Sequence, residues 1–156
     1  MLWNNRILQS LFLSQCKLGK VAAESIGEGL SKNSTLLKLD ISDNEFPADS
    51  LQSWAQCNPK SLRYLRSLDI SHNRYLCDTD IFNLLHCFRN QSFKLSKVEP
   101  RLGELNLKDT NMGEEAANFL LNLMANNTTL VKICLENNSL PAHYAEEVAT
   151  ACKRNK

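Results

Sequence analysis

One leucine-spaced pattern recurs five times along the 156 residues of the chain, and it constrains the fold more than any other feature. Each copy fits L-x-x-L-x-L-x-x-(N/C/T)-x-Φ, where Φ is a bulky apolar residue. The copies begin near positions 8, 36, 65, 102 and 130, so the period is nearly constant except for one longer interval after the third copy. A unit of this length cannot bury its apolar side alone, so neighbouring units must stack to form a continuous core. The pattern predicts one domain over residues 1–156.

Each copy begins like a strand, and the segment that follows it is spaced like a helix. Apolar and polar residues alternate from the fourth to the sixth position, which is the period of a strand. Apolar residues then recur three and four positions apart, as from Ala22, beside Val21, to Ile26 or from Leu51 to Trp54. We therefore expect an α/β solenoid of about five strand–helix repeats, with a parallel sheet on its concave face and helices on its convex face.

These five copies resemble the leucine-rich repeat family, and their long period resembles that of its helix-containing, ribonuclease-inhibitor-like subclass. The resemblance covers roughly residues 6–154, which is nearly the whole chain. It implies a horseshoe-shaped segment whose concave face is the usual docking surface for other proteins.

The ninth position of the pattern is polar or small in every copy. A side-chain amide at the point where the chain leaves the strand can pair with backbone groups that the turn would otherwise bury. We therefore interpret this column as internal scaffolding rather than a ligand site; its members are Cys16, Asn44, Asn73, Thr110 and Asn138.

Composition narrows the possible functions. The formal net charge of +1 gives no general attraction to nucleic acid, and no apolar run is long enough to span a membrane. The six cysteines contain no C-x-x-C pair and are spread over four of the repeats, which favours a reducing compartment. We expect a cytoplasmic protein, with the nucleus as an alternative, that uses no cofactor and binds neither nucleic acid nor membrane.

Polar positions of the strands should point out of the sheet into the concave surface. The third, fifth, seventh and eighth positions do so because their neighbours point into the core. Asp40 and Asp69 should then be near neighbours, with Asp43 and His72 beside them. This group is either an acidic patch for a basic partner or simply a frequent form of the repeat. The residues expected to contact a protein partner are Phe12, Lys38, Asp40, Asp43, Arg66, Asp69, His72, Asn106 and Asp109.

Metal binding and catalysis are disfavoured at the same place. His72 with Asp43 and Asp69 offers an imidazole and two carboxylates. An open, solvated sheet does not close a tetrahedral metal site, nor does it shift pKa values by desolvation. Cys134 on this face is interpreted as an ordinary small residue, because no column of cations is aligned to lower its pKa. We expect no enzyme activity and no bound metal.

Two irregularities remain in the pattern. The third repeat is longer than the others, and the excess falls at about residues 90–101. This insertion is either a contact loop or a neutral surface change. The end repeats show no recognisable caps, so the chain is either part of a longer array or covered at its ends by a partner or a second copy.

The preferred function is therefore a non-enzymatic interaction module or scaffold that binds a protein through its concave face. One alternative is direct regulation of an enzyme or small GTPase, as in ribonuclease inhibitor or the Ran GTPase-activating protein. Another is an actin-cytoskeleton role. The segment NNTTLVKICLENNSL at 126–140 and the irregular third repeat resemble the leucine-rich domains of tropomodulins and of CARMIL capping-protein regulators.

Overall fold

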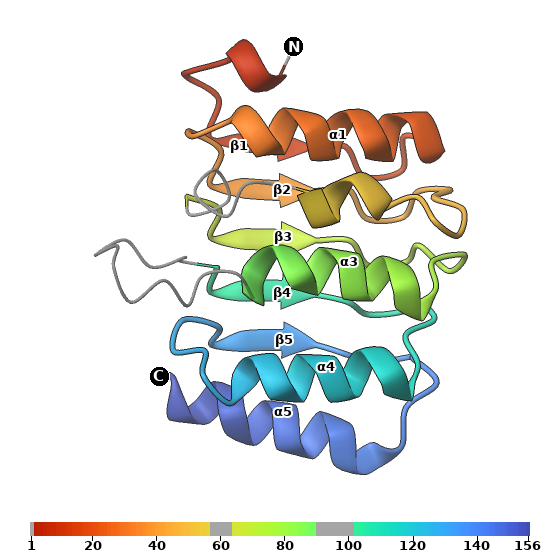
Figure 1. Cartoon of the computed structure of the whole chain (residues 1–156), viewed down its shortest axis with the longest axis vertical. Coiled ribbons are helices and arrows are strands. Elements are labelled where there is room, and N and C mark those ends of the chain that lie inside the picture. The colour runs from red at the N-terminus through yellow and green to blue at the C-terminus, as the bar shows by residue number, and fades with distance from the viewer. Residues whose placement is uncertain (1, 57–63, 90–101) are drawn as a thin grey trace.

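A computed structural model of the chain describes residues 2–56, 64–89 and 102–156, and in it five short strands form one parallel sheet (Figure 1). The strands lie side by side in chain order. Their register aligns the same position of every copy, so Leu39 pairs with Leu11 on one side and Leu68 on the other. The strands are β1 (Ser10–Phe12), β2 (Lys38–Asp40), β3 (Ser67–Asp69), β4 (Glu104–Asn106) and β5 (Lys132–Cys134).

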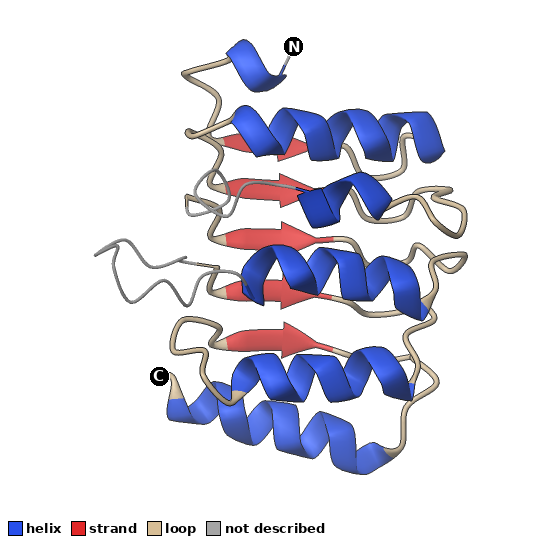
Figure 2. Cartoon of the chain, in the orientation of Figure 1, coloured by secondary structure: helices blue, strands red, loops and turns tan. Residues whose placement is uncertain are grey.

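Helices cover one face of this sheet and leave the other uncovered (Figures 1 and 2). Short 3-10 helices occupy η1 (Leu2–Asn4) and η2 (Gln52–Gln56). The α-helices are α1 (Lys20–Lys32), α3 (Asp78–Arg89), α4 (Glu114–Met124) and α5 (Ala142–Arg154). The expected fold class, an α/β leucine-rich-repeat solenoid, is confirmed. The insertion expected at 90–101 lies outside the described residues.

The second repeat departs from the expected pattern. Its described part contains the 3-10 helix η2 where the spacing of Leu51 and Trp54 predicts an α-helix, and residues 57–63 lie outside the described part. The buried indole of Trp54 lies against α1 and donates a hydrogen bond from Nε1 to the Ala23 carbonyl at 3.0 Å. Gly27 makes this approach possible, because a Cβ there would lie 2.7 Å from Trp54 Cδ1.

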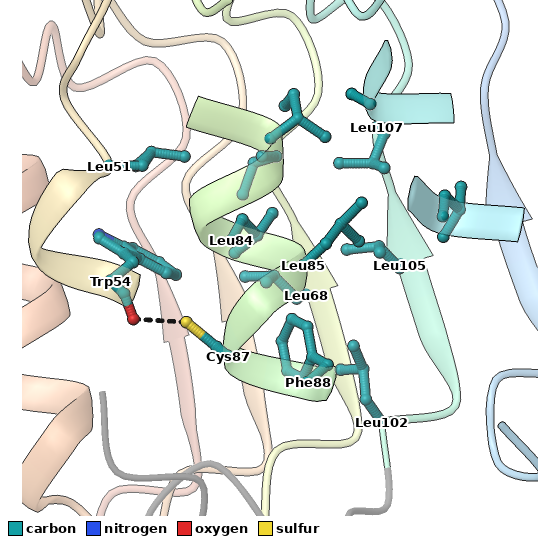
Figure 3. Packing of buried hydrophobic residues seen from close by; sticks show 14 of the residues in the cluster. Leu51, Trp54, Leu68, Leu84, Leu85, Cys87, Phe88, Leu102, Leu105 and Leu107 are labelled. Atoms are coloured by element: carbon teal, nitrogen blue, oxygen red, sulfur yellow. Dashed lines mark hydrogen bonds between the residues drawn. The ribbon is translucent and has the colours of Figure 1, made fainter. Parts of the chain in front are cut away.

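Leucines of the strands and the apolar sides of the helices form the core between the two layers. Figure 3 shows Leu84, Leu85 and Phe88 of α3 packed toward Leu68 and Leu105 of the sheet. On the other side of α3, the Cys87 thiol donates a hydrogen bond to the Trp54 carbonyl, so the third repeat is fastened to the shortened second one. Burial of this continuous apolar layer is the main favourable term in folding.

Two apolar residues were placed wrongly by spacing alone. Val21 is 76% exposed, and the buried side of α1 is formed instead by Ala23, Ile26 and Leu30. Tyr75 occupies the last position of the third copy, yet it is 70% exposed and Leu76 is fully buried in its place. The turn of this copy is one residue longer, so the apolar anchor moves by one position.

The ninth-position column forms the expected scaffold. The amide nitrogen of Asn44 donates to the carbonyls of Leu13, Ile41 and Ser42, and its Oδ1 accepts from the N–H groups of Cys16 and Leu18. The same two-sided bonding joins Asn138 to the turn around Thr110. Asn73 donates in the same manner, but its Oδ1 is buried without a hydrogen-bond partner among the described residues.

Two aspartates in the first turn of α3 connect three neighbouring repeats. The fully buried Asp80 accepts hydrogen bonds from the backbone N–H groups of Asp49 and Leu51 in the second repeat. Asp78 accepts from the N–H groups of Gly113 and Ala116 at the start of α4. Because free N–H groups at a helix start need acceptors, these side chains stabilise the neighbours of α3 as well as α3 itself.

The N-terminal repeat is partly covered by η1, an element that the pattern did not predict. At the N-terminal end, Asn33 at the end of α1 donates from Nδ2 to the Leu2 carbonyl of η1 at 2.9 Å. At the C-terminal end, Arg154 donates to the Met124 carbonyl and Asn155 to the Leu130 carbonyl. The contact with η1 corrects the expectation at the N-terminal end, whereas the two C-terminal hydrogen bonds join α5 and its C-cap to the end of α4 and the start of the fifth copy.

Candidate functional site

The candidate site is the face of the sheet that the helices leave uncovered, called here the sheet face. Register places the third-position residues of all five strands in one row across it and the fifth-position residues in another. Asp40 and Asp69 are direct partners in this register, as expected from the sequence. The fifth-position row contains Phe12, Asp40, Asp69, Asn106 and Cys134.

Each of the two paired aspartates also closes the turn that follows its own strand. Oδ1 of Asp40 accepts from the N–H of Ser42 at 2.9 Å and from its hydroxyl at 2.6 Å. Asp69 binds Ser71 in the same way and at the same distances. The two serines are consequently buried, and the expectation that the seventh position faces the concave surface is wrong for them. Part of the acidic group is thus structural.

Asn106 continues this row on β4. Its Nδ2 donates to the second carboxylate oxygen of Asp69 at 2.8 Å, and its Oδ1 accepts from the N–H of Lys108 at 3.2 Å. The amide therefore fills the place that a third aspartate would occupy. On this side Asp69 therefore has a neutral donor as its neighbour, where a third carboxylate would add repulsion between like charges.

The backbone conformation at the eighth position explains why polar residues occupy it. All five members have φ between 51° and 59°, the left-handed region in which Asn, Asp and His are the favoured non-glycine residues. Gln15 Nε2 donates to Asp43 Oδ2 at 2.7 Å, and His72 Nδ1 lies 3.0 Å from Asp109 Oδ2. The column comprises Gln15, Asp43, His72, Asp109 and Asn137.

Arg74 is a residue of this surface that the sequence did not single out. Its Nε donates to Asp109 Oδ2 at 2.7 Å, the same oxygen that His72 contacts. The hydrogen bond from Arg74, reinforced by the one from His72, holds the pKa of the Asp109 carboxyl below its ordinary value. Arg74 holds the tenth position of its copy, where the residue type differs from one copy to the next, so its place in the pattern gives no indication of the contact. The stacking of the repeats brings it to Asp109. The exposed Tyr75 follows it in the chain.

The two ends of the fifth-position row differ in character. Phe12 on the edge strand β1 is 67% exposed, so a large apolar side chain faces solvent at this end of the row. Cys134 on β5 is partly buried, and that burial raises the pKa of its thiol. The thiol is therefore less nucleophilic than an ordinary cysteine, in agreement with its interpretation as a small structural residue.

Charge is segregated along the direction of the strands. Near their amino ends the sheet face carries the cations Lys38, Arg66 and Lys132 against the single anion Glu104. Near their carboxyl ends and the following turns, acidic residues outnumber Lys17 and Lys108, and the Arg74 guanidinium and the His72 imidazole both lie on Asp109. The sheet face thus has a basic and an acidic half; the acidic residues are Asp40, Asp43, Asp69, Asp109 and Glu136.

The nine contact residues expected from sequence all fall on or beside this surface. The structure joins Asp69 to Asn106 and His72 to Asp109, whereas Lys38 and Arg66 stand apart from the acids at the amino ends of the strands. Within residues 2–56, 64–89 and 102–156, no group of three His, Cys, Asp or Glu residues is arranged to hold a metal ion. No helix of this described part is long and apolar enough to cross a bilayer.

Comparisons with known proteins show the fold. Neither protein-family models nor curated protein sequences give a match. A solved structure of leiomodin-1 actin-binding site 2 is similar with a TM-score of 0.76 and 15% identity, over 99% of this chain and 84% of that one. The Caenorhabditis elegans tropomodulin C-terminal domain is similar with a TM-score of 0.67 and 15% identity, over 99% and 88%. At this level of identity, both proteins share the fold of this chain.

Proposed function

We propose that this chain is a non-enzymatic protein-interaction module whose partner is actin, bound through the sheet face. The observation that carries the proposal is the likeness, over nearly the whole chain, to a leiomodin-1 domain described as an actin-binding site. The segregated charges of the sheet face support it. A surface with a basic and an acidic half fixes the orientation of a partner more strongly than a uniform one.

The same reasoning supports the finer assignments. The long period of the repeat, with α-helices after β1, β3, β4 and β5, favours the ribonuclease-inhibitor-like subclass. An actin partner places the chain in the cytoplasm, where free thiols such as those of Cys16 and Cys77 persist. Direct regulation of an enzyme stays an alternative without a specific contact that favours it. The residues proposed to touch the partner are Phe12, Lys38, Asp43, Arg66 and the half-buried carboxylates of Asp40 and Asp69.

Actin binding is tested by co-sedimentation with filaments and by thermophoresis with monomeric actin. The informative variant is Asp40→Asn/Asp43→Asn, because an amide keeps the oxygen that accepts from Ser42 and removes only charge. We expect actin binding by the wild type and a several-fold weaker Kd for this variant. Glu146→Gln/Glu147→Gln on the exposed side of α5 removes the same charge far from the sheet face and serves as the control.

Three outcomes decide the proposal. Binding that the sheet-face variant weakens and the α5 control leaves unchanged supports both partner and surface. Absence of binding to either form of actin overturns the partner. Binding that is equal in all three proteins overturns the sheet face as the docking surface.

A further inference from the structure

We propose that a hollow at the amino ends of strands β2 to β5 binds an acidic segment of the protein partner and holds a carboxylate between Lys38 and Arg66. This rests on the proposed docking through the sheet face and names the chemistry that its basic half recognises. The hollow has a volume of about 470 Å³; its lining residues are Lys38, Arg66, Ser67, Gly103, Glu104, Thr129 and Val131.

The two cations of the hollow are available to a ligand. Lys38 and Arg66 are both exposed, and neither side chain makes an ion pair or a hydrogen bond within the described residues. They belong to adjacent strands, since Lys38 pairs with Ser67 in the register and Arg66 precedes Ser67. Adjacent strands lie about 4.8 Å apart, a separation that one carboxylate can bridge. The guanidinium also offers two parallel N–H donors that match a carboxylate.

Glu104 limits where a carboxylate of the peptide can sit. Its Oε2 accepts a hydrogen bond from the Ser67 hydroxyl at 3.5 Å, so the one acidic side chain that lines the hollow extends from β4 toward β3. A ligand carboxylate is repelled by Glu104 and attracted to Lys38 and Arg66. The remaining Glu104 oxygen is suited to backbone N–H groups of the same peptide segment.

Gly103 opens the space that the peptide enters. Its backbone needs no glycine, since its φ is not positive and a Cβ would lie 3.7 Å from the Arg66 carbonyl and 3.8 Å from that of Thr129. The same position of other copies carries Leu37, Arg66 and Val131. The backbone conformation therefore does not require glycine at this position. What the absence of a side chain provides is the space of the hollow.

The test uses fluorescence anisotropy with a labelled eight-residue peptide of aspartate, glutamate and glycine, and with a lysine counterpart of the same length. We expect the wild type to bind the acidic peptide alone, and less tightly at high than at low salt, because salt screens exposed charges. Lys38→Glu/Arg66→Glu should raise the Kd for the acidic peptide about tenfold. An exposed ion pair changes a binding constant by up to roughly fivefold, and the double variant reverses the charge at both positions.

Three further variants distinguish this hollow from general charge attraction. Gly103→Gln fills the space without changing charge and should also abolish most binding, whereas Glu104→Gln should strengthen it about twofold. Lys20→Glu/Lys153→Glu on α1 and α5 gives the same change in net charge as the double variant and should bind the peptide like wild type. Circular dichroism melting curves confirm that each variant is folded.

The outcomes separate this proposal from actin binding. Binding of the acidic peptide that Gly103→Gln removes and Lys20→Glu/Lys153→Glu retains supports the hollow, whether or not actin binds. Equal binding of acidic and lysine peptides, or equal loss in the charge control, overturns it. A chain that binds actin but shows no affinity for the acidic peptide overturns the hollow and leaves the proposed function standing.

Discussion

The carboxylate of Asp78 at the start of α3 accepts a hydrogen bond from the backbone N–H of Gly113 at the start of α4, so one helix caps the next. A second hydrogen bond comes from the N–H of Ala116 at 3.4 Å. No side chain of α4's own N-cap performs this role, because the N-cap residue is Gly113 itself. The capping of α4 therefore depends on a neighbouring repeat.

Replacing Asp78 should weaken the junction between the third and fourth repeats. Asp78→Ala is expected to lower the free energy of unfolding by about 1 kcal/mol, the typical effect of losing a helix cap. Urea denaturation followed by circular dichroism measures it. Thr79→Ala, an exposed change in the same turn, is the control and should have a much smaller effect.

A double-mutant cycle tests the contact itself. A Cβ on Gly113 would lie 2.9 Å from Asp78 Oδ2, so Gly113→Ala should displace the carboxylate and cost nearly as much as Asp78→Ala. In an Asp78→Ala background the same change should cost little, since the obstructing oxygen is gone. Additive effects of the two substitutions would show that the cap is not formed.

Gly27 provides a second test, in which helix propensity and packing oppose each other. Alanine is the better helix former by about 1 kcal/mol, but here its Cβ would lie 2.7 Å from Trp54 Cδ1. We expect Gly27→Ala to destabilise the chain by about 1–3 kcal/mol through overpacking. Gly19→Ala at the N-cap of α1 is the control for added bulk alone, because a Cβ there meets nothing within 4 Å and only the weaker N-cap preference of alanine is expected to cost stability. A more stable Gly27→Ala variant would contradict the close contact between α1 and the indole.

The asparagine column gives a third prediction. Asn73 Nδ2 donates to the carbonyls of Ile41 and Ile70 at 3.1 and 2.8 Å, which ties two repeats together inside the protein. Asn73→Ala should lower the free energy of unfolding by about 2 kcal/mol, because buried carbonyls lose their donor. This corresponds to a fall in melting temperature of roughly 6 °C for a chain of this size. Asn122→Ala on the exposed side of α4 should leave the melting temperature nearly unchanged.

Much of this architecture follows from the period of the sequence. Because the copies recur at a nearly constant interval and stack directly, the neighbours Asp40 and Asp69 were predictable from their shared position. The Asp-x-Ser spacing of 40–42 and 69–71 also carries a signal for the turns it closes, since aspartate commonly bonds to groups two residues on. Burial of the two serines was therefore open to prediction, although strand alternation alone points them outward.

Other features depend on atoms from several repeats and could not be predicted from one repeat. Val21 and Ala23 are both apolar, and only the packing of α1 against its neighbours decides which is buried. The hollow beside Gly103 is formed by residues of several repeats and the loop before β5. Arg74 reaches Asp109 across 35 residues of sequence, so spacing within a copy gives no indication of the pair.

The Asp109 pair makes a prediction for pH. Its pKa is lower in the folded protein than in the unfolded chain, so the folded state binds fewer protons and gains stability above the unfolded pKa. That gain is lost as the pH falls through the folded pKa of Asp109.

Arg74→Ala should raise the pKa of Asp109 toward its ordinary value, because the hydrogen bond from Arg74 is the largest cause of its lowering. Carboxyl NMR titration measures the shift directly, and Lys153→Ala on α5 should leave it unchanged. The urea midpoint of Arg74→Ala should lie below that of wild type at pH 7, and the difference should shrink as the pH falls below the unfolded pKa of Asp109. A difference between the two proteins that stays constant as the pH falls would assign the effect of Arg74 to packing instead of charge.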